Sequence, residues 1–192
     1  LSSDGETRRY TANAIFVDVS AGLDHSLLVD SEGNVWAAGN NDHGQLGLDT
    51  SVRSMPYFVK VIDTKTNTAL GGAKVVAVSA GDKYSLALTS DGRVFAWGDN
   101  SHGQLGLHKV GGMVTAPTKL ALANVNGVSA GVDHSLFTMY DGSLYAAGSN
   151  VYGKMGQNSE YLPVDTDMGI PTFVPGTSTV VKASAGQDHS VV

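Results

Sequence analysis

Short runs of β-branched and aromatic residues, separated by turn residues, recur along most of the chain. The runs at residues 75–81 (VVAVSAG), 84–89 (YSLALT) and 92–98 (GRVFAWG) have the length of strands, and Asp91-Gly92 lies between the last two. An Asp-Gly pair between two such runs is typical of a two-residue β-hairpin. No segment shows a sustained helical period, so the pattern predicts an all-β fold.

Two sequence markers are repeated. The first has the core SAG and occurs as VSAGLDHSLLV, VSAGDKYSLAL, VSAGVDHSLFT and ASAGQDHSVV, starting at Val19, Val78, Val128 and Ala183. The second is a glycine-rich block, which occurs as WAAGNNDHGQLGL at 36–48, FAWGDNSHGQLGL at 95–107 and, in a weaker form, YAAGSNVYGKMGQ at 145–157. Internal repetition has to be interpreted before any single motif, because it decides the architecture.

The spacing of the two markers separates a constant part from a variable part. The serine of SAG and the last residue of the glycine-rich block are 28 positions apart in every complete copy, at Ser20 and Leu48, Ser79 and Leu107, and Ser129 and Gln157. Successive SAG serines are nevertheless 59, 50 and 55 residues apart. All the variation in length therefore lies between a glycine-rich block and the next SAG.

Each unit of roughly fifty residues contains four strand-like runs, because the variable part adds a further one, such as 57–62 or 115–122. This pattern predicts the blade of a β-propeller rather than a leucine-rich, ankyrin or helical repeat. We expect an incomplete propeller of three to four four-stranded antiparallel blades, completed by blades from the same or another chain. The repeats are expected to begin at residues 20, 79, 129 and 184, the last one truncated, with residues 1–18 as the end of a preceding connector.

These markers resemble those of the regulator of chromosome condensation repeat family. The resemblance rests on the SAG-x-x-[HY]-S strand entry, the [DE]G-x-[VL]-[FYW]-A-[WA]-G hairpin and the N-x-x-GQLG loop, and it covers about Val19 to Val192. The third loop departs from the pattern, with GKMG. The resemblance implies a seven-bladed propeller used as a rigid disc for binding, in roles that include nucleotide exchange on a small GTPase, docking to chromatin, adaptor functions and enzyme inhibition. A fold shared by such different roles does not select among them.

Composition narrows the range of partners. The chain has 192 residues, of which 42% are hydrophobic and 16% charged, and 24 are glycine. The net charge is −6, and Arg8-Arg9 is the longest basic run, so binding of nucleic acid, which depends on a basic patch, is not expected for this segment. The sequence lacks cysteine and has no apolar stretch of membrane-spanning length. The compartment stays open, with an intracellular setting favoured over an extracellular one.

The glycine-rich block follows a strand, as a dinucleotide-binding fingerprint does. That fingerprint requires a helix N-terminus to receive the pyrophosphate, and here the next signal is another strand. Asn41, Asn100 and Asn150 are expected to bond neighbouring backbone groups in a turn. We therefore expect no cofactor, and interpret the repeated glycines as structural: Gly22, Gly39, Gly44, Gly47, Gly81, Gly98, Gly103, Gly106, Gly131, Gly148, Gly153, Gly156 and Gly186.

The repeated Asp-His-Ser sequence invites comparison with a catalytic triad or a metal site. Adjacent side chains of a strand point to opposite faces, so His25 cannot activate Ser26. The second repeat has tyrosine at this position, and tyrosine can donate a hydrogen bond but does not replace imidazole as a typical metal ligand. No catalytic or metal-binding residue is predicted, and the repeated residues at this position are interpreted as structural: His25, Tyr84, His134 and His189.

Trp97 occupies a position at which the other copies have Ala38 and Ala147. Since two blades need no large side chain there, Trp97 is either a packing residue or a binding hot spot on an exposed face. Packing is the favoured interpretation, and Trp97 is kept as a candidate contact.

The connectors differ most between repeats, and loops on a rigid scaffold commonly carry binding specificity. We consider three of them: Asp63–Lys74, His108–Val114 and Asn158–Pro171. The candidate contact residues within them are Asp63, Lys65, Asn67, Lys74, His108, Met113, Glu160, Tyr161, Asp165, Asp167 and Met168. Simple solvated turns are the alternative for each connector.

The sequence thus favours a non-enzymatic module, a scaffold or adaptor that binds a protein partner through its variable loops. One alternative is a guanine-nucleotide exchange factor for a small GTPase, which the resemblance permits. A second is an extracellular or surface propeller, such as an enzyme inhibitor.

Overall fold

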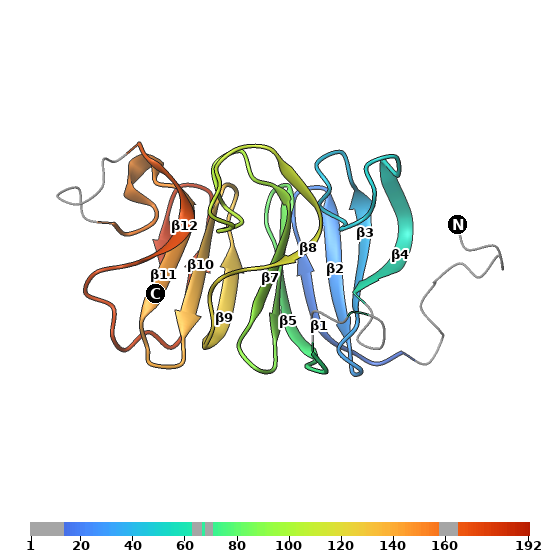
Figure 1. Ribbon diagram of the computed structural model, residues 1–192, viewed down its shortest axis with the longest axis horizontal. Helices are drawn as coiled ribbons and strands as arrows, with labels where there is room; N and C mark the ends of the chain where they lie inside the picture. Colours follow the sequence, from blue (N-terminus) through green and yellow to red (C-terminus); the bar gives the residue numbers. More distant parts are fainter. Residues whose placement is uncertain (1–13, 63–66, 68–70, 158–164) are drawn as a thin grey trace.

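The computed structural model describes residues 14–62, 67, 71–157 and 165–192, which form a row of antiparallel β-sheets (Figure 1). Three sheets have four strands each, in the orders β1-β2-β3-β4, β5-β6-β7-β8 and β9-β10-β11-β12, and β13 and β14 form a two-stranded sheet. Within each sheet, every strand pairs with its neighbour in sequence, so each sheet is an antiparallel meander. The predicted all-β architecture of four-stranded antiparallel blades is confirmed.

The first blade contains β1 (Phe16–Ala21), β2 (His25–Asp30), β3 (Val35–Asn40) and β4 (Ser54–Ile62). The second contains β5 (Val75–Ala80), β6 (Tyr84–Thr89), β7 (Val94–Asp99) and β8 (Met113–Lys119). The third contains β9 (Val125–Ala130), β10 (His134–Met139), β11 (Leu144–Ser149) and β12 (Asp167–Phe173). A fourth begins with β13 (Ser184–Ala185) and β14 (Ser190–Val191). The described residues contain no α-helix, only a 3-10 turn, η2 (Val151–Gly153).

The apolar core lies between the blades. Every residue of β6 is buried, because Ala87 packs towards the first blade while Leu86 and Leu88 pack towards the third. The cluster between the first two blades also contains Phe95 and Trp97, both completely buried. A sheet that is apolar on both faces has to be covered on both, so the second blade is stabilised by its two neighbours rather than by itself.

The serine of each SAG marker joins the inner strands of adjacent blades. The Ser20 hydroxyl oxygen accepts the backbone N–H of Ala80 at 2.9 Å, and Ser79 accepts from Ala130 at the same distance. The bond recurs between Ser129 and Ala185. These N–H groups lie on the open edge of an inner strand, so the serine side chain satisfies donors that no strand pairs with.

The connections between strands lie on two opposite faces of the row of blades. In each complete blade, the described parts of the connections from the first to the second strand and from the third to the fourth lie on one face, which we call the loop face. The turns between the second and third strands lie on the opposite face, the hairpin face (Figure 1). Lys74, at the described end of the connector from β4 to β5, lies beside Ser31 and Gly33 on the hairpin face, whereas residues 108–112 join β7 to β8 on the loop face. The three variable connectors therefore do not form one surface.

Two of those connectors also overlap strands. Met113 is the first residue of β8, and residues 167–171, including Asp167 and Met168, belong to β12. The expectation that these residues lie in loops is wrong, because the fourth strand of each blade starts within the segment that varies in length.

Gly103 tests how a glycine-rich loop packs on the next blade. Its φ is +81°, and a Cβ at this position would lie 2.6 Å from the Cα of Gly169 in β12. Gly153 has a similar φ of +72°, with no described atom within 4 Å of its Cβ position. Gly153→Ala should cost about 1 kcal/mol through strain alone, and Gly103→Ala about 2–4 kcal/mol through strain plus the clash. Urea denaturation measures both, and equal losses would contradict the packing argument.

Candidate functional site

The repeated His/Tyr-Ser sequence forms a contact between blades, which we call the clip. The Nε2 atom of His25 lies 2.9 Å from the Oγ of Ser85 in the next blade, and His134 Nε2 lies 2.9 Å from Ser190 Oγ. Between the second and third blades, Ser135 Oγ lies 3.0 Å from the hydroxyl of Tyr84. The side chain of one blade therefore reaches the serine of the following blade and not its own neighbour in sequence.

The clip serines also hold the preceding glycine-rich loop. Ser85 Oγ donates to the carbonyl oxygen of Gln45 at 2.7 Å, and Ser135 Oγ donates to that of Gln104 at 2.7 Å. A hydroxyl has one proton, so with Ser85 donating to the loop, His25 Nε2 must carry a proton and donate to Ser85. The His25 ring is then neutral, with an unprotonated Nδ1 that has no hydrogen-bond partner among the described atoms. Burial lowers the pKa of His25 to about 4, against smaller raising effects of Asp24 and the Tyr84 backbone.

Trp97 belongs to the same junction. Its side chain is completely buried, and its indole N–H donates to the Gln45 carbonyl oxygen at 2.9 Å. That oxygen thus accepts from both Ser85 and Trp97. Trp97 is a packing residue between the first two blades and is no longer a candidate contact, because no partner can reach it without separating the blades.

The asparagines of the glycine-rich loops bond backbone groups as predicted. Asn41 Nδ2 donates to the carbonyl oxygen of Val52 at 2.8 Å, and Asn100 Nδ2 donates to that of Lys109 at 2.8 Å. The Asn150 side-chain oxygen accepts from the N–H of Met155 at 3.2 Å. Each asparagine therefore closes its own loop on the loop face.

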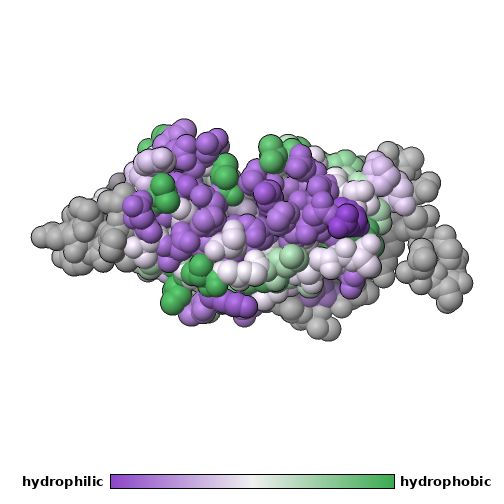
Figure 2. Space-filling view, turned by 90° about the horizontal axis from the view of Figure 1, so that it is seen from above, coloured by the Kyte–Doolittle hydropathy of each residue, from purple (hydrophilic) through white to green (hydrophobic). Residues whose placement is uncertain are grey.

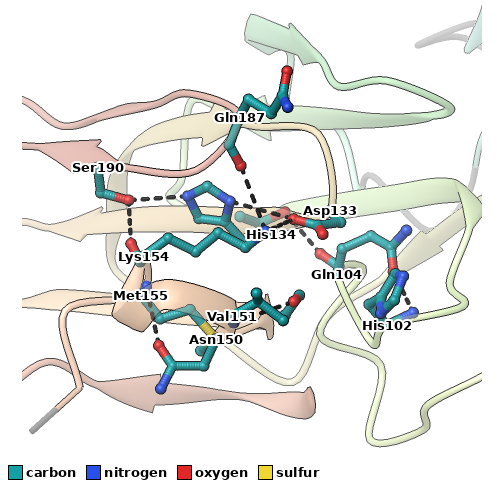
Figure 3. Close-up of polar contacts among 12 residues, drawn as sticks. His102, Gln104, Asp133, His134, Asn150, Val151, Lys154, Met155, Gln187 and Ser190 are labelled. Carbon is teal, nitrogen blue, oxygen red and sulfur yellow. Dashed lines mark hydrogen bonds and ion pairs between the residues drawn. The ribbon is translucent and has the colours of Figure 1, made fainter. Parts of the chain in front are cut away.

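The third loop departs from the other two through Lys154 (Figure 3). In the second loop, the Gln104 side-chain oxygen accepts the N–H of His102 at 2.9 Å. Lysine has no acceptor, and Lys154 instead turns inward, where its Nζ lies 2.6 Å from Asp133 Oδ1. The loop becomes a 3-10 turn, in which Tyr152 has a φ of 61°.

The Lys154–Asp133 pair is a buried ion pair, since Lys154 is only 5% exposed. Burial raises the pKa of Asp133, but the nearby His134 ring and the Lys154 ammonium group outweigh this effect and leave the pKa below its ordinary value. Removing one partner of such a pair leaves a buried charge, which is strongly destabilising. The departure to GKMG is visible in the sequence, but the pairing of Lys154 with Asp133 is not, because these two residues are 21 positions apart.

The loop formed by residues 108–112 is held by its backbone and not by its side chains. The N–H of His108 donates to the carbonyl oxygen of Gly169 at 2.8 Å, and the N–H of Gly111 donates to that of Asn100 at 2.7 Å. The side chains of His108, Lys109 and Val110 are exposed. Fixed backbone with free side chains is the arrangement that a binding loop requires.

The remaining candidate contacts are dispersed. Lys74, on the hairpin face, donates from Nζ to the carbonyl oxygen of Ser31 at 3.2 Å, and Asn67 is half-buried. On the other face, Asp165 is exposed and Asp167 Oδ2 lies 3.1 Å from His102 Nδ1. The other placements are as follows: Met113 is 49% exposed, Met168 packs against the core, and Asp63, Lys65, Glu160 and Tyr161 lie outside the described residues.

The repeated His/Tyr position differs between the first three repeats and the last one. His25, Tyr84 and His134 are buried in clips, as interpreted. His189 is exposed, and within the described part of the chain no serine of a following blade faces it. The structural role expected for His189 therefore stays a prediction.

The loop face is polar and mainly acidic, and Figure 2 shows hydrophilic residues over most of it with separate apolar patches. Its exposed and half-buried carboxylates outnumber the cations Arg53, Lys83 and Lys109; they are Asp24, Asp42, Asp49, Asp82, Asp99, Asp165, Asp167 and Asp188. Where the structure describes the chain, no group of three His, Asp or Glu side chains could hold a metal ion. None of the described segments is a helix long and apolar enough to cross a membrane.

Successive four-stranded blades, joined by clips at each junction, define a β-propeller repeat protein. A sequence model described as "Regulator of chromosome condensation (RCC1) repeat" matches residues 32–88, 91–138 and 141–192, and a second with the same description matches 16–45, 75–104 and 125–154. The chain belongs to this repeat family.

Relatives and solved structures agree with this assignment. The chain is 42% identical over 92 residues to the human X-linked retinitis pigmentosa GTPase regulator, covering 47% of this chain and 8% of that protein. It is 42% identical over 93 residues to the Drosophila melanogaster regulator of chromosome condensation, covering 47% and 16%. Yeast RCC1 (Prp20), solved with Kap60 bound to it, superimposes with a TM-score of 0.79 at 28% identity, over 95% of this chain and 42% of that one. The chain thus spans less than half the length of these proteins.

The neutral His25 ring predicts a pH dependence. Its pKa is about 4 in the folded state and about 6.5 when unfolded, so the stabilisation is complete above pH 6.5 and is lost as the pH falls towards 4. Between pH 7.5 and pH 5, where carboxylates stay ionised, His25 should account for about 2 kcal/mol of lost stability. Urea denaturation at the two pH values should show that the free energy of unfolding falls less in His25→Gln than in the unchanged protein, by about 2 kcal/mol. The same loss in both proteins would contradict the neutral clip.

Proposed function

We propose that this chain is a non-enzymatic protein-interaction module, a scaffold or adaptor, and that it binds its partner through the loop face. The observation that carries the proposal is the division between repeated and variable side chains. The repeated polar groups His25, Tyr84 and His134 are buried in contacts between blades, whereas the side chains that differ between blades project from loops fixed by backbone bonds.

The loop of residues 108–112 is the strongest candidate on that face. It lies between blades that are both described, and its exposed side chains include a cation and an apolar residue, Lys109 and Val110. Binding sites of this mixed character are common in transient protein interfaces. The acidic surroundings favour a partner with a basic surface, since charge complementarity increases the association rate and selects partners.

A triple variant tests the proposal: His108→Ala, Lys109→Ala and Val110→Ser. Because these side chains make no core contact, the melting temperature should stay within about 2 °C, while affinity for the native partner should fall about tenfold or more. The partner is first identified by crosslinking to the protein, and the affinity is then measured with the purified pair by calorimetry. Tyr140→Ser is the matched control, since Tyr140 is 67% exposed and lies on the hairpin face.

Loss of affinity in the triple variant with none in Tyr140→Ser supports the loop face. The reverse result moves the binding site to the hairpin face. Unchanged affinity in both variants would exclude the side chains of residues 108–110 and Tyr140, and would leave the other turns and loops and the outer strands.

A second candidate function is guanine-nucleotide exchange on a small GTPase. Two comparisons favour it: a relative is named a GTPase regulator, and the structure of yeast Prp20p, with a TM-score of 0.78 at 28% identity, was described together with its binding to Gsp1p and histones. The acidic loop face of this chain does not favour a nucleic acid partner.

Exchange activity and scaffolding differ in turnover. An exchange factor should accelerate release of a fluorescent GDP analogue from a GTPase at one hundredth of the GTPase concentration, and a scaffold should leave the rate unchanged. The triple variant serves again as a control, because acceleration that survives it would place the exchange site elsewhere.

A further inference from the structure

The SAG turns of four successive repeats line one shallow, open surface. These turns, residues 22–24, 81–83, 131–133 and 186–188, lie side by side on the loop face, at the inner strands β1, β5, β9 and β13. A depression of about 260 Å³ lies among them. It is lined mainly by small residues of the turns and strand ends, with two larger apolar side chains, Leu23 and Val132. We call this depression the mouth.

The floor of the mouth is rigid. The N–H of Asp82 donates to the carbonyl oxygen of Gly131 at 3.3 Å, and that of Val132 donates to the carbonyl oxygen of Gly186 at 3.4 Å. The second turn is therefore bonded to the third, and the third to the fourth. A Cβ at Gly131 would lie 2.6 Å from the Gly186 carbonyl oxygen, so the turns are also in close contact. A preformed surface of this kind loses little conformational entropy on binding.

The apolar side chains at the mouth are not required by the turn. Leu23 is 66% exposed and Val132 is 37% exposed. The equivalent positions in the second and fourth repeats are Asp82 and Gln187, so the same turn forms with polar side chains. Two large apolar side chains that the fold does not bury are therefore available to an apolar group of a partner.

Charge around the mouth indicates what flanks that apolar group. The next position of each turn is Asp24, Lys83, Asp133 or Asp188. Asp133 is already neutralised by Lys154 at 2.6 Å. With Asp82, the free groups of the turns are three carboxylates and one ammonium group. A partner segment that carries Lys or Arg beside its apolar residue would therefore be favoured over an acidic one.

We propose that the mouth binds an extended segment of a protein partner, with one apolar side chain inserted between Leu23 and Val132 and basic residues on either side. The inference rests on the proposed binding function and adds the chemistry of the partner. Burial of one Leu-sized side chain in the mouth should contribute about tenfold or more to the affinity.

The test uses the purified protein and labelled pentapeptides. The probe is acetyl-Arg-Lys-Leu-Lys-Arg, with two comparison peptides that have serine in place of leucine or glutamate in place of every basic residue. Fluorescence anisotropy should show binding of the probe, at least tenfold weaker binding of the serine peptide and none of the glutamate peptide. Binding of the probe should weaken between 50 and 300 mM salt, since exposed charges are screened. Amide NMR shifts should concentrate at Gly81, Gly131 and Val132.

Variants of the protein separate the mouth from the rest of the loop face. Val132→Ser and Leu23→Ser should each weaken the probe about tenfold, whereas Val110→Ser should not; Val110 is 45% exposed on the same face but does not line the mouth. Asp82→Lys should weaken the probe and reduce its salt dependence. Circular dichroism and melting temperature verify that each variant is folded.

Equal binding of the leucine and serine peptides, equal losses in Val132→Ser and Val110→Ser, or no binding of any peptide would each overturn the mouth assignment. These results would leave the proposed function standing if the triple variant of residues 108–110 still loses its native partner. Conversely, the triple variant could keep its affinity for the native partner while Val132→Ser loses affinity. This result would support the mouth as the binding site and exclude the outer loops.

Discussion

The contact on which the rest of the structure depends is the junction between adjacent blades. The second and third blades are apolar on both faces, so they are stable only when neighbours cover them, and the polar groups buried in each junction have to be satisfied within it. The clip does this with few atoms. The Ser85 hydroxyl accepts from the imidazole of one blade and donates to the loop carbonyl of the same blade, so a single side chain satisfies two groups of its neighbour.

The positions that are repeated in the sequence are the ones that this junction uses. Strand number, blade order and the structural part of the glycine-rich block could be predicted because they follow from local periodicity and from substitutions among copies; tyrosine in place of histidine indicated a hydrogen bond rather than a metal. The exceptions could not be predicted, because they depend on contacts between distant segments. Trp97 looked variable, yet it fills the space beside the Gln45 carbonyl oxygen, and Lys154 pairs with Asp133 across a turn and a hairpin.

The separation between buried junction residues and exposed variable residues explains where a binding site can lie. Residues that hold the blades together are buried, and most changes to them cost stability, so variation is found mainly in the loops and in the turn positions that point away from the junctions. The loop at 108–112 and the mouth are both of this type, since their geometry is fixed by backbone bonds and their side chains are not needed for folding. Specificity can therefore change with little effect on stability.

The clip also has a direction. Each of the three complete blades presents its imidazole or phenol to the following blade, which receives it through a serine, so the contact is head-to-tail and not self-complementary. A tandem duplication of one such unit inherits both halves of the interface and can pack on its parent without a new mutation. A blade with two different sides is in this way suited to lengthening of the array by gene duplication. The presence of Tyr84 in place of histidine shows that one half of the junction can diverge while the serine of the other half is kept.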